Sequence, residues 1–129
     1  MKIASIIARI LFGLAFTAAG GIGLYLAFSS GPPPVPGFPL AEQFQSVAFR
    51  SHFTVFVNAV QLIVGILLLI NRYVALALMA GAAVLANILA YHITMMPIGI
   101  FPGLILTVCW ILVALPLKST LLPLLRAKV

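Results

Sequence analysis

The side chains that could take part in chemistry are five polar residues set within two long apolar stretches: Asn58, Gln61, Asn87, Tyr91 and His92. At about 100° per residue, a helix would place Asn58 and Gln61 on one face, and Asn87 and Tyr91 on one face of the next helix. Amides and phenols donate and accept hydrogen bonds without a fixed charge. The chemistry that this set suggests is hydrogen bonding to a neutral partner.

Two interpretations of these polar residues remain open. An unpaired amide inside a membrane costs several kcal/mol. The polar groups would therefore either hydrogen-bond between helices and hold them together, or line a small polar pocket near the outer face. A quinone headgroup needs such hydrogen-bond partners beneath an apolar cover.

A metal site is the third alternative for the outer side. The candidate ligands are His52, His92, Met95 and Met96. Soft or borderline donors of this kind would suit copper. However, the two histidines are far apart in sequence, and a His-x-x-Met-Met pattern is not specific for a metal. We therefore expect no metal site.

Catalytic residue sets are missing from the sequence. The chain has one acidic residue, Glu42, and its single cysteine, Cys109, excludes an internal disulfide. No carboxylate pair, Ser/His/Asp set or phosphate-binding glycine loop is present. Proton relays and ion paths usually need charged groups inside the membrane, and the apolar stretches have none in their interiors. We expect that the chain is not an enzyme by itself.

The composition places these residues in lipid rather than in water. Hydrophobic residues make up 64% of the chain and charged residues 6%, and the mean hydropathy is +1.31. A soluble domain is about a quarter charged. The net charge of +6 comes from basic residues scattered singly along the chain. This pattern argues against nucleic-acid binding and fits topology signals and contacts with anionic lipids.

Four stretches are long enough to span a bilayer: residues 3–28, 53–70, 73–92 and 98–117. About 20 helical residues cover a hydrocarbon core of ~30 Å. Because lipid offers no hydrogen-bond partner to the backbone, each stretch should form a helix. The sequence thus predicts an all-α, integral membrane four-helix bundle, and a single membrane domain over residues 1–129.

The segments outside these stretches are a loop over 29–52 and a tail over 118–129. The loop begins with a stiff, proline-rich segment and continues into a short amphipathic helix over 41–50. One face of that helix should carry Phe44, Val47 and Ala48. The helix would act either as a spacer or as a docking surface on the outer membrane face. The tail should lie at the cytoplasmic interface, close to anionic headgroups.

The distribution of basic residues predicts the topology. With four spanning helices, one side of the membrane holds six basic residues: Lys2, Arg9, Arg72, Lys118, Arg126 and Lys128. The other side holds only Arg50. Since basic residues concentrate on the cytoplasmic side, both termini should be cytoplasmic. An odd number of helices would separate the two basic ends.

Three segments carry a family resemblance: residues 65–73 (GILLLINRY), 86–92 (ANILAYH) and 8–14 (ARILFGL), the last continuing to Ala19 and Gly20. Through them the chain resembles the DoxX and DoxX-like family of small four-helix bacterial membrane proteins. The resemblance implies a multi-pass protein of the bacterial cytoplasmic (inner) membrane. Many relatives look as though they carry a basic and an acidic residue where this chain has Asn58 and Gln61, which weakens the case for a proton-coupled role.

The resemblance also implies a class of function. Members of the family are linked to sulfur or thiol redox complexes and to quinone-reducing assemblies, usually as membrane subunits. The first hypothesis is therefore a non-catalytic subunit or anchor that assembles with other membrane or redox proteins, or with copies of itself. The second is a quinone-interacting component of an oxidoreductase. A small transporter formed by oligomerisation is the least favoured alternative.

Overall fold

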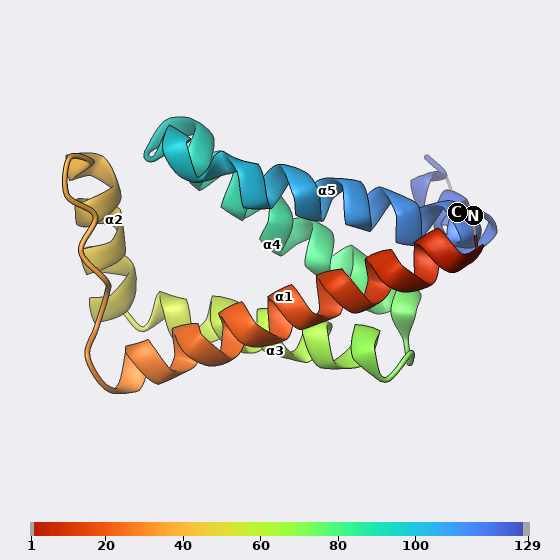
Figure 1. Cartoon of the computed structure of the whole chain (residues 1–129), viewed down its shortest axis with the longest axis horizontal. Coiled ribbons are helices and arrows are strands. Elements are labelled where there is room, and N and C mark those ends of the chain that lie inside the picture. Colours follow the sequence, from red (N-terminus) through yellow and green to blue (C-terminus); the bar gives the residue numbers. More distant parts are fainter. Residues whose placement is uncertain (1, 128–129) are drawn as a thin grey trace.

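The computed structural model describes residues 2–127, and this part of the chain is helical and contains no strand. Its α-helices are α1 (Lys2–Phe28), α2 (Pro39–Arg50), α3 (Phe53–Leu69), α4 (Val74–Thr94), α5 (Ile100–Ala114) and α6 (Lys118–Leu121) (Figure 1). Three short 3-10 segments complete it: Pro97–Gly99, Leu115–Leu117 and Leu122–Leu125. The prediction of an all-α chain is confirmed. Lys128, one of the residues used to predict the topology, lies outside the described residues.

Several helices are long and apolar enough to cross a membrane. By length and hydropathy these are α1, α4 and the continuous C-terminal run Pro97–Leu125. α3 qualifies as a fourth only together with α2, from which it is bent by 87°. Many large apolar side chains on these helices point outward, and Leu14 and Ile105, for example, are 52% and 64% exposed. Such surfaces indicate a membrane protein, because lipid can cover them and water would not.

The predicted stretch over 98–117 is not a single uniform helix. A 3-10 turn at Pro97–Gly99 precedes α5, and another at Leu115–Leu117 follows it. Proline has no backbone N–H and clashes with the preceding helical turn, so Pro97 and Pro116 mark these changes. In the predicted loop over 29–52, α2 occupies the second half.

Close packing of α1 against α3 depends on glycine. A Cβ at Gly20 would lie 2.6 Å from the backbone nitrogen of Leu62, and a Cβ at Gly65 would lie 2.5 Å from the backbone nitrogen of Thr17. Both distances are shorter than real Cβ contacts. Glycine at these positions therefore lets the two backbones approach closely, as small residues do between membrane helices.

Spacing by four along the sequence suggests two stripes of small residues on α1: Gly13, Thr17 and Gly21, and also Ala19, Gly23 and Ala27. The structure uses parts of both, since Gly23 as well as Gly13 faces α3. A spacing of four would align Gly13, Thr17 and Gly21, but a Cβ at Gly21 would meet nothing within 4 Å. Gly20 faces α3 instead. A step of seven residues turns a helix by about −20°, whereas two steps of four turn it by about +80°. The contact face therefore follows the spacing 13, 17 and 20.

A tight turn joins α3 to α4 and makes them an antiparallel hairpin. Asn71 and Tyr73 have positive φ values of 56° and 51°. The Arg72 amide donates to the Leu67 carbonyl at 3.0 Å, which closes the end of α3. Asparagine tolerates this left-handed conformation well, whereas it is uncommon for tyrosine.

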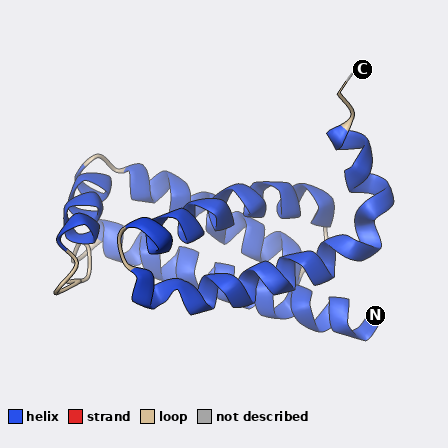
Figure 2. Ribbon diagram, turned by 90° about the horizontal axis from the view of Figure 1, so that it is seen from above, coloured by secondary structure: helices blue, strands red, loops and turns tan. Residues whose placement is uncertain are grey.

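The packed helices form two pairs that separate toward one end. α1 packs most extensively on α3 and also contacts α5, while α4 contacts both α3 and α5. Figure 1 shows the two pairs diverging away from the chain termini, with α2 standing across the wide end. Both termini and the α3–α4 turn lie at the narrow end. Figure 2, viewed at 90° to Figure 1, shows the segment after α5 turning away from the long axis of the molecule.

The core lies between these pairs. Its most buried large side chains are Phe12, Phe16, Val64, Leu68 and Leu78. The Phe12 and Phe16 rings pack on each other at 4.4 Å between centroids. The Trp110 indole on α5 donates to the Leu78 carbonyl of α4 at 2.8 Å, which fixes these two helices side by side. The outer end, where the pairs separate, leaves room for a pocket.

Candidate ligand-binding pocket

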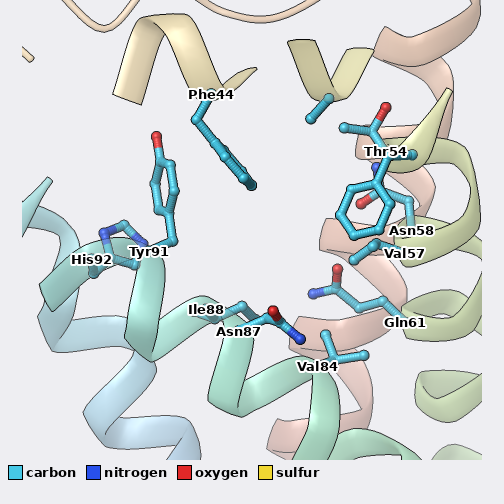
Figure 3. A pocket seen from close by; sticks show the side chains of 12 residues that line it. Phe44, Thr54, Val57, Asn58, Gln61, Val84, Asn87, Ile88, Tyr91 and His92 are labelled. Atoms are coloured by element: carbon cyan, nitrogen blue, oxygen red, sulfur yellow. The ribbon is translucent and has the colours of Figure 1, made fainter. Parts of the chain in front are cut away.

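A pocket of about 190 Å³ lies where α3 and α4 diverge, next to α2. All five polar residues singled out from the sequence line it: Asn58, Gln61, Asn87, Tyr91 and His92. They come from α3 and α4, and Phe44 of α2 contributes an aromatic wall. Figure 3 shows these side chains around one common space. The hairpin thus brings together residues up to 34 positions apart in sequence (92 − 58).

Gln61 and Asn87 lie at the inner end of the pocket. Gln61 is only 7% exposed and is the one buried polar side chain within residues 2–127. Figure 3 shows the two amides directed toward each other across the space between α3 and α4. The Asn87 amide nevertheless donates to the Ala83 carbonyl of its own helix, at 3.0 Å. No hydrogen bond joins these two amides in the described part of the chain.

Asn58 lies on the same face of α3, closer to α2 than Gln61, and its side chain reaches toward α1. A Cβ at Gly23 would overlap the Asn58 amide group, so Gly23 provides the space that this side chain occupies. Between Asn58 and α2, Thr54 also lines the pocket. The Thr54 hydroxyl is buried and has no hydrogen-bond partner. An unpaired buried hydroxyl is costly, and a rotation of this side chain toward the pocket would let a bound ligand supply the missing partner.

Tyr91 connects the pocket to α2. Its hydroxyl accepts a 2.9 Å hydrogen bond from the side-chain amide of Gln45. Its ring packs against Phe44 at 5.6 Å and against His92 at 5.1 Å between centroids. The Gln45 carbonyl oxygen is buried without a partner. Reasoning from the sequence missed Gln45, because nothing local indicates that α2 folds back onto α4.

The buried face of α2 also differs from the predicted face. Ala41 and Ala48 are buried, whereas Val47 is 65% exposed. Seven residues separate the two alanines, which a helix places about 20° apart, while Val47 is about 100° from Ala48. His52, with a left-handed φ of 61°, makes the sharp bend into α3. Small side chains thus let α2 lie close to the other helices.

The candidate metal ligands do not gather around the pocket. Among them only His92 lines it, and its Nδ1 lies 3.1 Å from the Met96 carbonyl oxygen. His52 is exposed at the bend between α2 and α3. Within residues 2–127 no group of three or more His, Cys, Asp or Glu side chains could hold a metal ion.

The lining of the pocket determines what it can bind. It combines amides, a phenol and an imidazole with apolar walls from Phe44, Val57 and Ile88, and it includes no carboxylate, lysine or arginine. Such a site favours a neutral ligand with an apolar ring and oxygen atoms that accept hydrogen bonds. Comparison with protein-family models, with curated proteins and with solved structures finds no match to this chain.

Proposed function

We propose that this protein is a four-helix membrane subunit that binds the headgroup of a quinone in the pocket between α3 and α4. In this proposal α1, α3, α4 and residues 97–117, which comprise α5 and its flanking 3-10 turns, span the bilayer as a bundle, with both termini cytoplasmic. The observation that carries the proposal is the gathering of five polar side chains, none of them a carboxylate, lysine or arginine, around one pocket in an apolar chain.

The topology is supported by the positions of the basic residues. The termini and the α3–α4 turn lie at one end of the molecule, and α2, which carries Arg50, lies at the other. The first end includes Lys2, Arg9, Arg72, Lys118 and Arg126. The positive-inside rule then makes that end cytoplasmic and puts the pocket in the outer half of the membrane.

The size of the pocket supports a headgroup rather than a whole lipid-like molecule. Pockets that enclose a drug-sized ligand measure about 300–1,000 Å³. A volume of about 190 Å³ is smaller and suits one substituted ring. The isoprenoid tail of a quinone would remain in the surrounding lipid.

The hydrogen-bonding groups suit the two carbonyl oxygens of a quinone ring. Gln61 and Asn87 offer amide donors at the inner end, while Thr54 offers a hydroxyl nearer to α2. Phe44 and Tyr91 offer aromatic faces next to that space. These groups bind and orient a ring, and the pocket residues include no carboxylate that could pass a proton to it. In this proposal a partner protein supplies the electrons, in the manner of a DoxX-like subunit of a bacterial redox complex.

Titration of the purified protein in detergent with a short-chain benzoquinone tests the proposal. We expect Gln61→Leu and Asn87→Leu each to weaken binding about tenfold, since each removes a proposed hydrogen bond to the ring in a largely apolar setting. Thr107→Val is the matched control, because the Thr107 hydroxyl bonds only the Gly103 carbonyl of its own helix and lies outside the pocket. Equal affinity in all four proteins, or no measurable binding, would refute the proposal.

A further inference from the structure

A second cavity, of about 280 Å³, lies at the opposite end of the molecule from the quinone pocket. The beginning of α1, the α3–α4 turn and the end of α5 surround it. Its polar lining consists of Lys2, Ser5, Arg9 and Asn71. Apolar side chains form the remaining walls, among them Ile6, Val74 and Leu117. Two cations, a hydroxyl and an amide therefore face one space next to an apolar surface.

The two cations lack an acidic partner in the described part of the chain. The only acidic side chain of the protein is Glu42, on α2 at the other end. The Arg9 guanidinium donates to the Leu68 carbonyl near the end of α3. Arginine has five N–H donors, so this contact positions the group and leaves donors free. Arg9 is half-buried, and the described part of the chain offers it no acidic side chain, so the cavity favours an anion from outside.

The start of α4, like Lys2 and Arg9, favours an anion in this cavity. Val74 is the first residue of α4 and lines the cavity, and the residue before it, Tyr73, provides no side-chain cap. The first backbone N–H groups of a helix have no partner within that helix, and together with the helix dipole they attract anions.

The partial negative charge at the end of α3, which would oppose anion binding, is already neutralised. The end of α3 would repel an anion through its free carbonyl groups. The Leu67 carbonyl accepts from the Arg72 amide, and the Leu68 carbonyl accepts from the Asn71 amide and from Arg9. The negative end of α3 is therefore largely occupied, and the local field is that of Lys2, Arg9 and the start of α4.

We infer that this cavity binds a phosphate group, carried either by an anionic phospholipid or by free phosphate. Basic pockets between membrane helices on the cytoplasmic side are suited to phospholipid headgroups. The apolar wall beside Lys2 and Arg9 would accept the first methylene groups of an acyl chain. This inference concerns a different site from the quinone pocket and does not depend on quinone binding.

Native mass spectrometry of the purified protein with added phosphatidylglycerol, phosphatidylcholine or inorganic phosphate tests the inference. We expect phosphatidylglycerol to be retained over phosphatidylcholine. Lys2→Gln should reduce that retention about fivefold, the effect of one basic residue near an anionic lipid. Arg72→Gln is the matched control, because it removes the same charge at the same end but does not line the cavity.

The added lipids and inorganic phosphate distinguish the two sources of a phosphate group. Lys2 is substituted because a change at this residue should not disturb folding. Arg9→Gln could disturb folding by losing the contact with Leu68, whereas the Lys2 side chain forms no hydrogen bond within residues 2–127. Binding of inorganic phosphate that Lys2→Gln weakens, without selective lipid retention, would identify a free anion as the ligand. Equal retention of phosphatidylglycerol and of phosphate by the wild type, Lys2→Gln and Arg72→Gln would overturn the inference.

Discussion

The side-chain amide of Gln45 on α2 donates a 2.9 Å hydrogen bond to the hydroxyl of Tyr91 on α4, across 46 residues of sequence. Phe44, next to Gln45, packs on the same tyrosine ring. Together these contacts hold α2 over the side of the pocket where α3 and α4 diverge. α2 thus forms one wall of the pocket, next to the polar residues of α3 and α4.

Tyr91→Phe should loosen α2 without altering the rest of the fold. The substitution removes one hydrogen bond, worth about 1 kcal/mol, and keeps the ring that packs on Phe44. We expect the backbone amides of α2 to exchange hydrogen about fivefold faster, as mass spectrometry of the protein in detergent would measure. Tyr25→Phe is the control, because Tyr25 is 70% exposed. Unchanged exchange in Tyr91→Phe would show that the hydrogen bond does not hold α2.

Gly20→Ala should destabilise the protein, whereas Gly21→Ala should not. A Cβ at Gly20 would collide with the backbone of Leu62, which cannot move without separating α1 from α3. We expect a loss of about 1–3 kcal/mol, seen as a lower midpoint of thermal unfolding in detergent. Gly21 has open space around its Cβ position, so alanine there should be neutral or stabilising by up to about 1 kcal/mol. Equal midpoints for the two variants would contradict the α1–α3 packing.

Thr54→Val should stabilise the protein and weaken ligand binding at the same time. The Thr54 hydroxyl is buried without a partner, so its removal should raise the free energy of unfolding by about 1 kcal/mol. The same hydroxyl is proposed to bond a quinone oxygen, so benzoquinone affinity should fall several-fold. Thr107→Val, which removes a satisfied hydroxyl, should lower stability slightly and leave affinity unchanged. A loss of stability in Thr54→Val would indicate a structural role for this residue.

Single-cysteine labelling tests the topology. In a Cys109→Ala background, a cysteine placed at Pro34 should react with a membrane-impermeant maleimide added to intact cells. A cysteine at Ser119, beyond α5, should react only after the membrane is opened, because the positive-inside rule places that end in the cytoplasm. Labelling of both positions in intact cells would contradict the proposed orientation.

The sequence predicts the helices well, because a membrane leaves few alternatives to a long apolar helix. The shared face of Asn58 and Gln61 likewise follows from helical spacing alone. The contact face of α1 was predicted less well, since spacing by four suggested Gly21 where the structure uses Gly20. Each step of four residues moves a side chain about 40° around a straight helix, so repeated steps of four leave the contact face.

The parts that local patterns could not predict depend on contacts between distant segments. The hydrogen bond from Gln45 to Tyr91 and the shared cavity of Arg9 and Asn71 join residues that are at least 46 positions apart. α2 packs against α4 because the chain bends at His52. That residue has a positive φ, and no glycine there indicates the bend in the sequence. The sequence therefore predicts the polar residues of the outer pocket but not its contact with α2, and it does not indicate the cavity around Lys2 and Arg9.

Photolabelling with an azidoquinone tests the quinone pocket most directly, because it reports where the ring binds. After illumination of the protein in lipid nanodiscs, the label should be found by peptide mass spectrometry within residues 54–61 of α3 and 84–92 of α4. An excess of unlabelled short-chain benzoquinone should suppress it. Labelling spread over the lipid-facing residues of all helices, with no suppression by the competitor, would contradict a quinone site between α3 and α4.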